Sequence, residues 1–418
     1  MKNFKITLIP ALIALLLILF ATTGLQAQLS GSYDIGGGSN HFTTILNAVD
    51  SLNQVGVSGP VVFNIYYATY TGFHQINPIS GASQTNTVTF NGIPGPNNAM
   101  PVVTNPSDDG FFLNGASFII FQGLEFTSCG GYGGIYSDFN SSTSDSASYI
   151  TIDGCYFHDQ GVSYNQYCYR SHHIIIRNSE FAGGSYGIRV RYCTNVEAYN
   201  NMIYGQTTSG LYSHNTASSK YHYNSIYTQG SYTLRIGTGQ EDNIVTNNIA
   251  YNFATSSTYG CVYYQAAPTL HDYNCFYAPN GAPIARYLST SCATLQALQS
   301  ASQQEANSVG TDPLFVSTTD LHLQDNSPCI EAGTPVADIL YDFDGDPRRG
   351  VGGARAAERG RPAGLSRDVR PRAGGAEGAD QRAGSRLARG PRRHRPAAAG
   401  VRGVDVDESA PRGRSYGF

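Results

Sequence analysis

Short runs of β-branched and aromatic residues recur through the middle of the chain. Each run is ended by Asn or Gly, with an aromatic residue three positions later, and the leading residues are 23 to 31 positions apart. The seven copies are Gly123-Leu-Glu-Phe126, Gly154-Cys-Tyr-Phe157, Asn178-Ser-Glu-Phe181, Asn201-Met-Ile-Tyr204, Asn224-Ser-Ile-Tyr227, Asn248-Ile-Ala-Tyr251 and Asn274-Cys-Phe-Tyr277. A period in this range indicates stacked repeats, in which each unit buries its apolar face on its neighbours.

Each repeat is predicted to be built of strands. A run such as Ile174–Ile176 precedes the marker, and a second run, usually opened by Gly as in Gly187-Ile-Arg-Val190, follows about ten residues later. The region lacks helical periodicity, and two or three short strands per repeat are typical of one coil of a parallel β-helix. Asn and Gly suit a sharp corner because both tolerate left-handed backbone conformations. Stacked Asn side chains can also bond each other, so we expect a ladder of Asn178, Asn201, Asn224, Asn248 and Asn274 on one corner.

This pattern resembles the right-handed parallel β-helix repeat of pectate-lyase-like proteins over roughly residues 60–280. The resemblance implies an all-β fold, a right-handed parallel β-helix or solenoid, which we assign to residues 59–290. One fold carries many functions, so the resemblance is specific for the fold and not for an activity.

The N-terminal part is predicted to hold a signal and a cap. Lys2 and Lys5 precede an apolar run, and the small-residue site before Gln28 predicts a signal peptide over residues 1–27, cleaved near Ala27. We therefore expect a secreted or outer-surface protein with no membrane span after cleavage; the alternative is an uncleaved membrane anchor. Residues 28–58 form an N-terminal cap, because a short helix with an apolar stripe can cover the first coil. The stripe is Phe42, Ile45, Leu46, Val49 and Leu52.

The segment 291–349 has its own order of motifs. A helix candidate at Ala293–Ala306 is followed by Thr311-Asp-Pro-Leu-Phe315, Ser327-Pro-Cys-Ile-Glu-Ala-Gly333 and Asp342-Phe-Asp-Gly-Asp-Pro-Arg348. This series resembles the closing module of secreted bacterial β-helix proteins of the choice-of-anchor type. The family's final Asp-Ile-Gly-Ala-x-Glu-aromatic motif is missing, so we interpret the module as truncated, with its sorting or anchoring route undefined.

Composition changes abruptly at the end of this module. Residues 350–418 hold 15 Arg and no Lys, Ile, Asn, Thr or Cys. Translation of GC-rich codons in the wrong reading frame produces a composition of this kind. We interpret this tail as a disordered frameshift product; the alternative is a genuine basic tail. The tail has a net charge of +8, whereas residues 28–349 hold 9 basic and 23 acidic residues, a net charge of −14. An acidic body argues against a nucleic-acid partner.

Basic and aromatic residues gather on one predicted face. Side chains alternate along a strand, so we expect Tyr136, Cys168, Arg189, Tyr212, Arg235 and Val262 to form an outward column, with Asp138, Arg170, Arg191, His214, Gly237 and Tyr264 beside it. Four of the six Arg between residues 28 and 347 fall on this face. We expect Arg189, Tyr212 and Arg235 to be partly exposed in a shallow groove.

Arg and Tyr side by side suit an acidic sugar chain, because Arg binds carboxylates with two hydrogen bonds and Tyr offers a flat apolar face. The predicted ligand-binding residues are Arg189, Arg191, Tyr212, Arg235 and Tyr136. In β-helix polysaccharide lyases, the resemblance implies, the active groove lies along such a strand face, and a basic group abstracts a proton beside a neutralised uronate carboxylate. Lys220, His214 or Tyr212 would be the base. The alternative is an ordinary solvated surface.

Other chemistries have weaker support. Asp153 and Asp159 lie near a corner and do not form the facing carboxylate pair of a glycosidase. The pair His172-His173 lacks a third ligand at metal spacing, and the Asp residues 342, 344 and 346 resemble only half of a calcium loop. We therefore predict no metal and no cofactor, with Ca²⁺ as the one alternative.

The eight Cys do not form a disulfide scaffold in a chain of this length. Cys168, Cys193 and Cys261 recur at similar places in their repeats, which fits either stacked small apolar residues or a Cys168–Cys193 disulfide between neighbouring coils.

The sequence thus predicts a monomeric, non-catalytic, secreted or cell-surface β-helix protein that binds polysaccharides or cell-surface glycans. The alternative function is a polysaccharide lyase that acts on a uronate-containing chain by β-elimination.

Overall fold

The computed structural model describes residues 27–37, 41–160, 164–239, 242–255 and 259–348. The predicted signal segment before Ala27 and the predicted tail 350–418 lie outside these residues. Within the described ranges, no helix is both long and apolar enough to cross a membrane.

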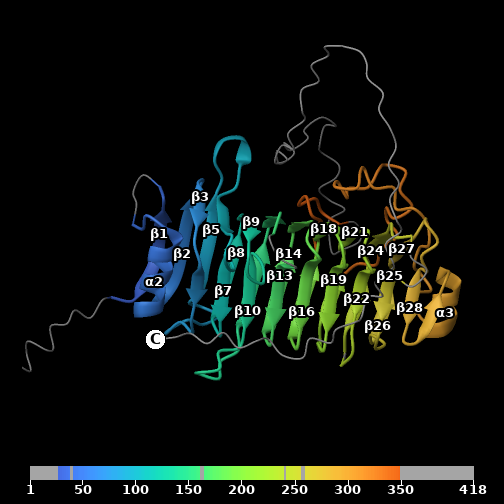
Figure 1. Cartoon of the computed structure of the whole chain (residues 1–418), viewed down its shortest axis with the longest axis horizontal. Helices are drawn as coiled ribbons and strands as arrows, with labels where there is room; N and C mark the ends of the chain where they lie inside the picture. Colours follow the sequence, from blue (N-terminus) through green and yellow to red (C-terminus); the bar gives the residue numbers. More distant parts are fainter. Residues whose placement is uncertain (1–26, 38–40, 161–163, 240–241, 256–258, 349–418) are drawn as a thin grey trace, which may run out of the picture. The chain divides into compact units, whose positions relative to one another are not determined.

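The described chain winds into successive coils that build three sheets, here called sheets A, B and C (Figure 1). Sheet A contains β1 (Leu29–Ile35), β2 (Val57–Tyr66), β5 (Val88–Ile93), β8 (Ser117–Gln122), β11 (Ser148–Asp153), β14 (His172–Arg177), β17 (Thr194–Tyr199), β20 (Lys220–His222), β23 (Ile244–Thr246) and β26 (Leu270–Asp272). Sheet B contains β3 (Thr69–Thr71), β6 (Val102–Asn105), β9 (Glu125–Cys129), β12 (Tyr156–His158), β15 (Glu180–Ala182), β18 (Met202–Gln206), β21 (Ser225–Thr228), β24 (Ile249–Asn252) and β27 (Cys275–Tyr277). Sheet C contains β4 (His74–Ile76), β7 (Phe111–Asn114), β10 (Ile135–Asp138), β13 (Tyr164–Tyr169), β16 (Tyr186–Arg191), β19 (Ser209–His214), β22 (Tyr232–Ile236), β25 (Gly260–Tyr264), β28 (Ala285–Tyr287) and β29 (Thr290–Cys292). The predicted all-β parallel β-helix is confirmed.

Equivalent positions of successive coils lie above one another. Strands of successive coils pair in parallel, as in the match of Ile150 with Ile174 and of Ile174 with Val196, whereas β28 and β29 pair antiparallel. These three side chains are buried, and so are the rings of Phe126 and Phe157, which stack with their centroids 4.7 Å apart. Because paired strands are about 4.8 Å apart, the inward positions form continuous columns, most of them apolar. Burial of these columns is the main stabilising contribution to a stack of repeats.

An asparagine ladder runs along the corner between sheets A and B. The Nδ2 group of Asn201 donates to Oδ1 of Asn224 at 2.9 Å, and the same bonds join Asn224 to Asn248 at 2.9 Å and Asn248 to Asn274 at 3.3 Å. All four side chains are buried, with at most 1% exposed. The ladder therefore satisfies polar groups that would otherwise be costly to bury.

Asn178 is not a member of this ladder, contrary to the sequence prediction. Ser179 occupies the ladder position, and its backbone N–H donates to Oδ1 of Asn201 at 3.1 Å. Asn178 lies one residue earlier, at a left-handed corner with φ 49°, and its Nδ2 group donates to Asp153 at 2.8 Å. In later coils this corner position holds residues such as Asn200, at φ 53°. Left-handed geometry explains the preference for Gly and Asn there.

The repeating sequence motif therefore mixes two registers one residue apart. Phe181 faces the core with 0% exposed, whereas Tyr204 lies on the outer surface of sheet B, where its ring packs on other side chains. The strands pair Phe181 with Ile203, so Ile203 is the inward equivalent in the next coil. A shift of one residue moves a side chain to the opposite face of a strand.

Helix α2 (Ile45–Val55) covers the first coils, as predicted for the N-terminal cap. Thr44 caps the helix, because its side-chain oxygen accepts the Asn47 N–H. The buried face contains Ile45, Ala48, Val49 and Leu52. Leu46, predicted on the apolar stripe, is instead 43% exposed.

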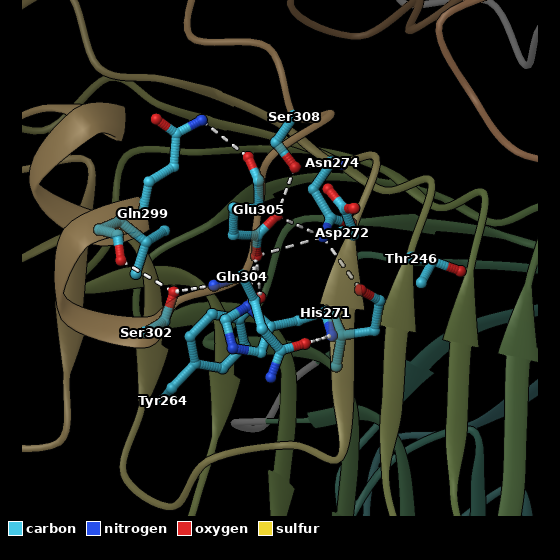
Figure 2. A network of polar contacts seen from close by, with 12 residues as sticks. Thr246, Tyr264, His271, Asp272, Asn274, Gln299, Ser302, Gln304, Glu305 and Ser308 are labelled. Atoms are coloured by element: carbon cyan, nitrogen blue, oxygen red, sulfur yellow. Dashed lines mark hydrogen bonds and ion pairs between the residues drawn. The ribbon is translucent and has the colours of Figure 1, made fainter.

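Helix α3 (Leu295–Ser302) and the turn after it close the C-terminal end with a buried polar network around Glu305 (Figure 2). The carboxylate of Glu305 accepts from His271 Nδ1 at 2.7 Å, from the Tyr264 hydroxyl at 3.1 Å and from Asn274 Nδ2 at 3.2 Å. The Ser308 hydroxyl also donates to it. Since Asn274 is the last Asn of the ladder, Glu305 ends the ladder with an acceptor that satisfies it.

Residues 309–348 return along the stack, and we call them the C-terminal strap. Thr334 donates its N–H to Asn247 Oδ1 at 2.7 Å and accepts from the Tyr223 hydroxyl at 2.5 Å, and Tyr341 accepts from Asn200 Nδ2 at 2.8 Å. The strap also buries Phe315 and Leu321 in a cluster with side chains of sheet B, Met202, Tyr204 and Tyr227. It therefore contacts several coils in turn. Its assignment to a choice-of-anchor module stays a prediction.

The buried side chain of His222 makes the free energy of unfolding depend on pH. Only 5% of this residue is exposed, and burial lowers its pKa to about 4. The unfolded histidine takes up a proton near pH 6.5, so the stabilisation present above that pH is lost as the pH falls towards 4. This group should lower the free energy of unfolding by roughly 3 kcal/mol across that window. Denaturant unfolding at pH 7 and pH 4.5 would measure the loss, which should be smaller in His222→Gln. An equal loss in the variant would contradict this assignment.

Candidate functional site

A column of alternating tyrosines and arginines follows the outer face of sheet C, whose strands lie side by side in Figure 1. The strand pairing places its members directly above one another, from β10 to β28. We call this column the Tyr/Arg stripe: Tyr136, Tyr167, Arg189, Tyr212, Arg235, Tyr263 and Arg286. Arg189, Tyr212 and Arg235 are consecutive in it.

At two places in this column, the sequence prediction named the residue next to the one that faces outward. Cys168 and Val262 face the core with 1% and 0% exposed. Their neighbours Tyr167 and Tyr263 occupy the outward positions, paired with Arg189 and Arg235. The reason is that coils of different length cannot be aligned by their opening residue alone, and each slip of one position inverts the face.

The second predicted column has the same errors. The structure confirms the pairing of Arg191 with His214, but Tyr169 takes the place predicted for Arg170. Arg170 lies at the following corner, with φ 49°, and its guanidinium carbon is 4.8 Å from the Tyr169 ring. Tyr264, predicted to face outward, is fully buried beside the Glu305 network.

Arg189 is surrounded by tyrosine rings. Its guanidinium carbon lies 4.8 Å from the ring centroid of Tyr164, 5.0 Å from that of Tyr186 and 5.2 Å from that of Tyr167. The ring of Tyr212 lies 5.5 Å away on the next coil, and the Tyr164 hydroxyl accepts a hydrogen bond from Nη1. Its buried Nε–H group has no hydrogen-bond partner. Cation–π contacts of this kind fix the plane of the guanidinium.

The same arrangement continues towards the C-terminal end. The guanidinium carbon of Arg235 lies 4.5 Å from the Tyr212 ring centroid and 5.6 Å from that of Tyr263, and Arg286 lies 5.2 Å from Tyr263. Nε of Arg235 donates to Gln265 Oε1 at 3.1 Å. Each tyrosine between two arginines is thus covered on both sides, and Tyr212 is only 5% exposed. The prediction of a partly exposed Tyr212 is wrong for this reason, whereas Arg189 and Arg235 are half-buried.

The arginines of the stripe carry positive charge without a carboxylate partner. Among the described residues, no carboxylate lies within 4 Å of a nitrogen of Arg189, Arg235 or Arg286. The basic residues on sheet A are different, since Arg177 pairs with Asp153 at 2.9 Å. The stripe is therefore a positive line on an acidic body.

Tyr136 faces an acidic residue at the N-terminal end of the stripe. Its hydroxyl donates to Asp138 Oδ2 at 2.7 Å. Burial raises the pKa of Asp138, and the hydrogen bond from Tyr136 opposes this effect. Tyr136 is 6% exposed, so it contributes little to the surface of the stripe.

The predicted proton-abstracting residues do not gather at the stripe. Lys220 lies in β20 of sheet A, and its Nζ pairs with Glu197 at 2.8 Å. Burial raises the pKa of Tyr212, although Arg235 and Arg189 oppose the shift, so its phenolate is not favoured near neutral pH. His214 does lie beside the stripe, where Nδ1 shares a hydrogen bond of 2.7 Å with the Tyr212 hydroxyl and Nε2 one of 3.1 Å with Thr238.

The other candidates from the sequence have local partners. His172 and His173 contact each other through Nδ1 atoms 2.9 Å apart. Asp159, just after β12 of sheet B, contacts His158 at 2.8 Å, whereas Asp153 ends β11 of sheet A and pairs with Arg177 at 2.9 Å. Neither pair forms a recognisable hydrolytic centre.

The segment that resembles half of a calcium loop forms hydrogen bonds within itself and with His322. Oδ1 of Asp342 accepts the backbone N–H groups of Asp344 at 3.0 Å and of Asp346 at 2.9 Å. The Asp344 carboxylate contacts His322 Nε2 at 3.0 Å. In the parts of the chain that the structure describes, no group of three or more His, Cys, Asp or Glu side chains is placed to hold a metal ion.

A cleft of about 910 Å³ lies between the ladder corner and the C-terminal strap. Its lining includes Asn248, Asn274, Cys275, Cys329 and Arg348. The cleft therefore lies on a different side of the coil from the stripe. It is not the shallow groove that was predicted on sheet C.

The sequence prediction missed Arg286 and the rings of Tyr164 and Tyr186. Arg286 continues the alternation of Arg and Tyr by one more step, and this regularity would have identified it once Tyr263 was placed correctly. Tyr164 and Tyr186 pair at the start of their strands, where side-chain alternation from the opening Gly gives no guidance.

A family model supports the fold. Residues 142–296 match a family model described as a right-handed β-helix region. No curated protein matches the chain. A solved pectate lyase, Pel9A, is 15% identical with a TM-score of 0.41 and covers 75% of this chain and 94% of its own. The pectate lyase Bsp165PelA from Bacillus sp. N165, in complex with trigalacturonate, is 12% identical with a TM-score of 0.39, covering 68% and 96%.

A glycoside hydrolase has a similar degree of likeness. The GH136 lacto-N-biosidase from Eubacterium ramulus is 10% identical with a TM-score of 0.39, covering 62% of this chain and 66% of its own. Identities this low do not transfer a function to this chain. The chain is an all-β right-handed parallel β-helix.

Proposed function

We propose that this protein is a secreted or cell-surface, non-catalytic binder of an extended acidic polysaccharide, which lies along the Tyr/Arg stripe of sheet C. The observation that supports the proposal is the line of arginines, held between tyrosine rings and lacking carboxylate partners, on an otherwise acidic body. The proposal does not require a catalytic residue.

The geometry of the stripe suits an extended ligand with repeated carboxylates. Arginines alternate with tyrosines, so Arg189, Arg235 and Arg286 recur at every second coil, roughly 10 Å apart when neighbouring strands are about 4.8 Å apart. A guanidinium pairs with a carboxylate through two parallel hydrogen bonds. Stacking between rings restricts the arginine rotamers before binding, which lowers the entropic cost of ordering them in a complex.

The polysaccharide lyase alternative has less support from the site. β-Elimination requires a base within hydrogen-bond reach of the proton it removes. Lys220 is on another sheet and is paired with Glu197. The pKa of the Tyr212 hydroxyl is raised by burial. His214 is the remaining candidate, and its position beside Tyr212 keeps the alternative testable.

Binding and catalysis can be measured on the same samples. The purified protein would be titrated calorimetrically with pectate, alginate and chondroitin, with neutral dextran as the control. We expect an acidic polysaccharide to bind and the affinity to fall with added salt, because charge pairs at a surface are screened. Ultraviolet absorbance should stay constant, since no unsaturated product forms. Equal binding of dextran or no binding at all would contradict the proposed function, and rising absorbance would support the lyase instead.

A further inference from the structure

Eight cysteines are present as free thiols, and seven of them are buried. Most bond only to nearby backbone, as in the contact of Cys193 Sγ with the Cys168 carbonyl oxygen at 3.5 Å. Neither Cys168 nor Cys193 bonds to the other's sulfur. Their burial inside the coil agrees with stacked small apolar residues.

Cys275 and Cys329 differ from the others because they come from distant parts of the chain and line one cleft together. Cys275 begins β27 in the last coil of sheet B, and Cys329 belongs to the C-terminal strap, 54 positions later. The two side chains line the same cleft, where the interaction between them raises the pKa of Cys275 and lowers that of Cys329. Cys329 is half-buried and can be reached from solvent, whereas Cys275 is 3% exposed.

The surroundings hold both thiols in this place. Cys275 is bridged to Val309 in parallel fashion, and its Sγ donates to the Thr311 carbonyl oxygen at 3.4 Å. The Cys329 N–H donates to Ser327 Oγ at 3.1 Å, which fixes the turn that carries it. Both cysteines are thus positioned by backbone on two segments that the fold already brings together.

We propose that Cys275 and Cys329 form a disulfide bond that fastens the C-terminal strap to the last coils when the protein is in an oxidising compartment. Such compartments are where disulfides persist. The bond would close a loop that contains β28, β29 and α3, together with the Glu305 network. It would therefore hold the strap, helix α3 and the end of the asparagine ladder as one unit.

The chemistry is thiol–disulfide exchange with a small-molecule or protein disulfide as oxidant. The Cys329 sulfur loses its proton and attacks one sulfur of the oxidant, which breaks the oxidant's S–S bond and releases one thiolate. Cys275 then loses its proton and attacks the mixed disulfide, forming the Cys275–Cys329 bond and releasing the second thiolate. Two electrons pass to the oxidant, which leaves as two thiols after taking up both protons. The interaction with Cys275 lowers the pKa of Cys329, and this favours Cys329 as the first nucleophile.

The pairing can be mapped by mass spectrometry. The full chain would be equilibrated with oxidised glutathione, alkylated without reduction and digested with a protease that cuts after aromatic residues. Cuts at Phe276 and Tyr287 separate Cys275 from Cys292, and a cut at Phe315 separates Cys292 from Cys329. We expect one cross-linked pair of peptides, containing Cys275 and Cys329, and alkylation of the other six cysteines once the protein is unfolded. Full alkylation of Cys275 and Cys329, or a cross-link to another cysteine, would overturn the proposal.

Stability provides the second measurement. Reduction of the oxidised wild-type protein should lower its melting temperature by several °C, because the cross-link restricts the unfolded chain. Cys329→Ser should melt at the temperature of the reduced wild type and show no change on reduction. Cys292→Ser, at the end of β29 just before helix α3, is the matched control and should still melt at a lower temperature after reduction. A response in Cys329→Ser equal to that of the wild type would overturn the assignment even if both variants fold.

Discussion

The double substitution Arg189→Ala/Arg235→Ala should weaken binding of an acidic polysaccharide by about 100-fold. Each arginine would lose charge-assisted hydrogen bonds to a carboxylate, and such bonds contribute about 1.5–3 kcal/mol each. Isothermal titration with the polysaccharide that binds the wild type best would measure the change. The effect should shrink at high salt, because the wild-type charge pairs are themselves screened there.

The control for this variant removes the same charge from another sheet. Arg177→Ala/Lys220→Ala also deletes two positive charges, but from sheet A, where both side chains pair with acids. We expect its affinity to stay within about threefold of the wild type, since long-range charge effects are screened at physiological salt. Equal losses in the two double variants would mean that net charge alone attracts the glycan and that the stripe is not the site.

The stripe variant should still fold. Its arginines stack on tyrosines, so their removal should cost about 1–2 kcal/mol of unfolding free energy through lost cation–π contact and packing. Circular dichroism and thermal melting would check this. A fully unfolded variant would mean that the stripe is mainly a structural element of sheet C.

Glu305→Ala should lower the free energy of unfolding by about 3–5 kcal/mol, which is the usual cost of removing one partner from a buried pair of ionisable groups. The substitution leaves His271, Tyr264 and Asn274 without the carboxylate that accepts their hydrogen bonds. The side chains of His271 and Glu305 have no exposed surface, so water cannot replace the lost hydrogen bonds unless the C-terminal end of the coils opens. Chemical denaturation would measure the loss.

Glu197→Ala is the matched control, because it also removes a glutamate that pairs with a basic residue. The side chains of Glu197 and Lys220 are 38% and 45% exposed, so their pair should contribute no more than about 1 kcal/mol. Similar losses in the two variants would contradict the role of Glu305 as the buried end of the ladder. Glu305→Gln should fall between them, since an amide oxygen can still accept one of the bonds.

The sequence was sufficient for the architecture because the repeat encodes it locally. Apolar positions such as Ile150 and Ile174 recur at a near-constant period, and their alternation with polar neighbours specifies strands with one buried face. The corner residues, Gly154 among them, indicated where each coil turns. The consecutive placement of Arg189, Tyr212 and Arg235 also followed from this periodicity, since these three coils have nearly equal length.

Register between coils was decided only by the tertiary structure. Adjacent asparagines such as Asn200 and Asn201 fill two different positions, the left-handed corner and the ladder, and either one fits the sequence motif. The motif therefore led to the wrong position for Asn178. The same uncertainty of one residue led to the prediction that Cys168, and not Tyr167, faces outward. Strand pairing removes the uncertainty because only one register buries every apolar column.

Contacts between distant segments were also beyond the sequence pattern. Glu305 lies outside the repeat, and nothing in its neighbourhood indicates that it meets His271 and Asn274 in the interior. The approach of Cys329 to Cys275 likewise depends on the path of the strap back over the last coils. The sequence by itself determined the coil, because a coil is made of local alternation and turns, whereas only the folded chain decided which residues of separate coils and of the strap meet.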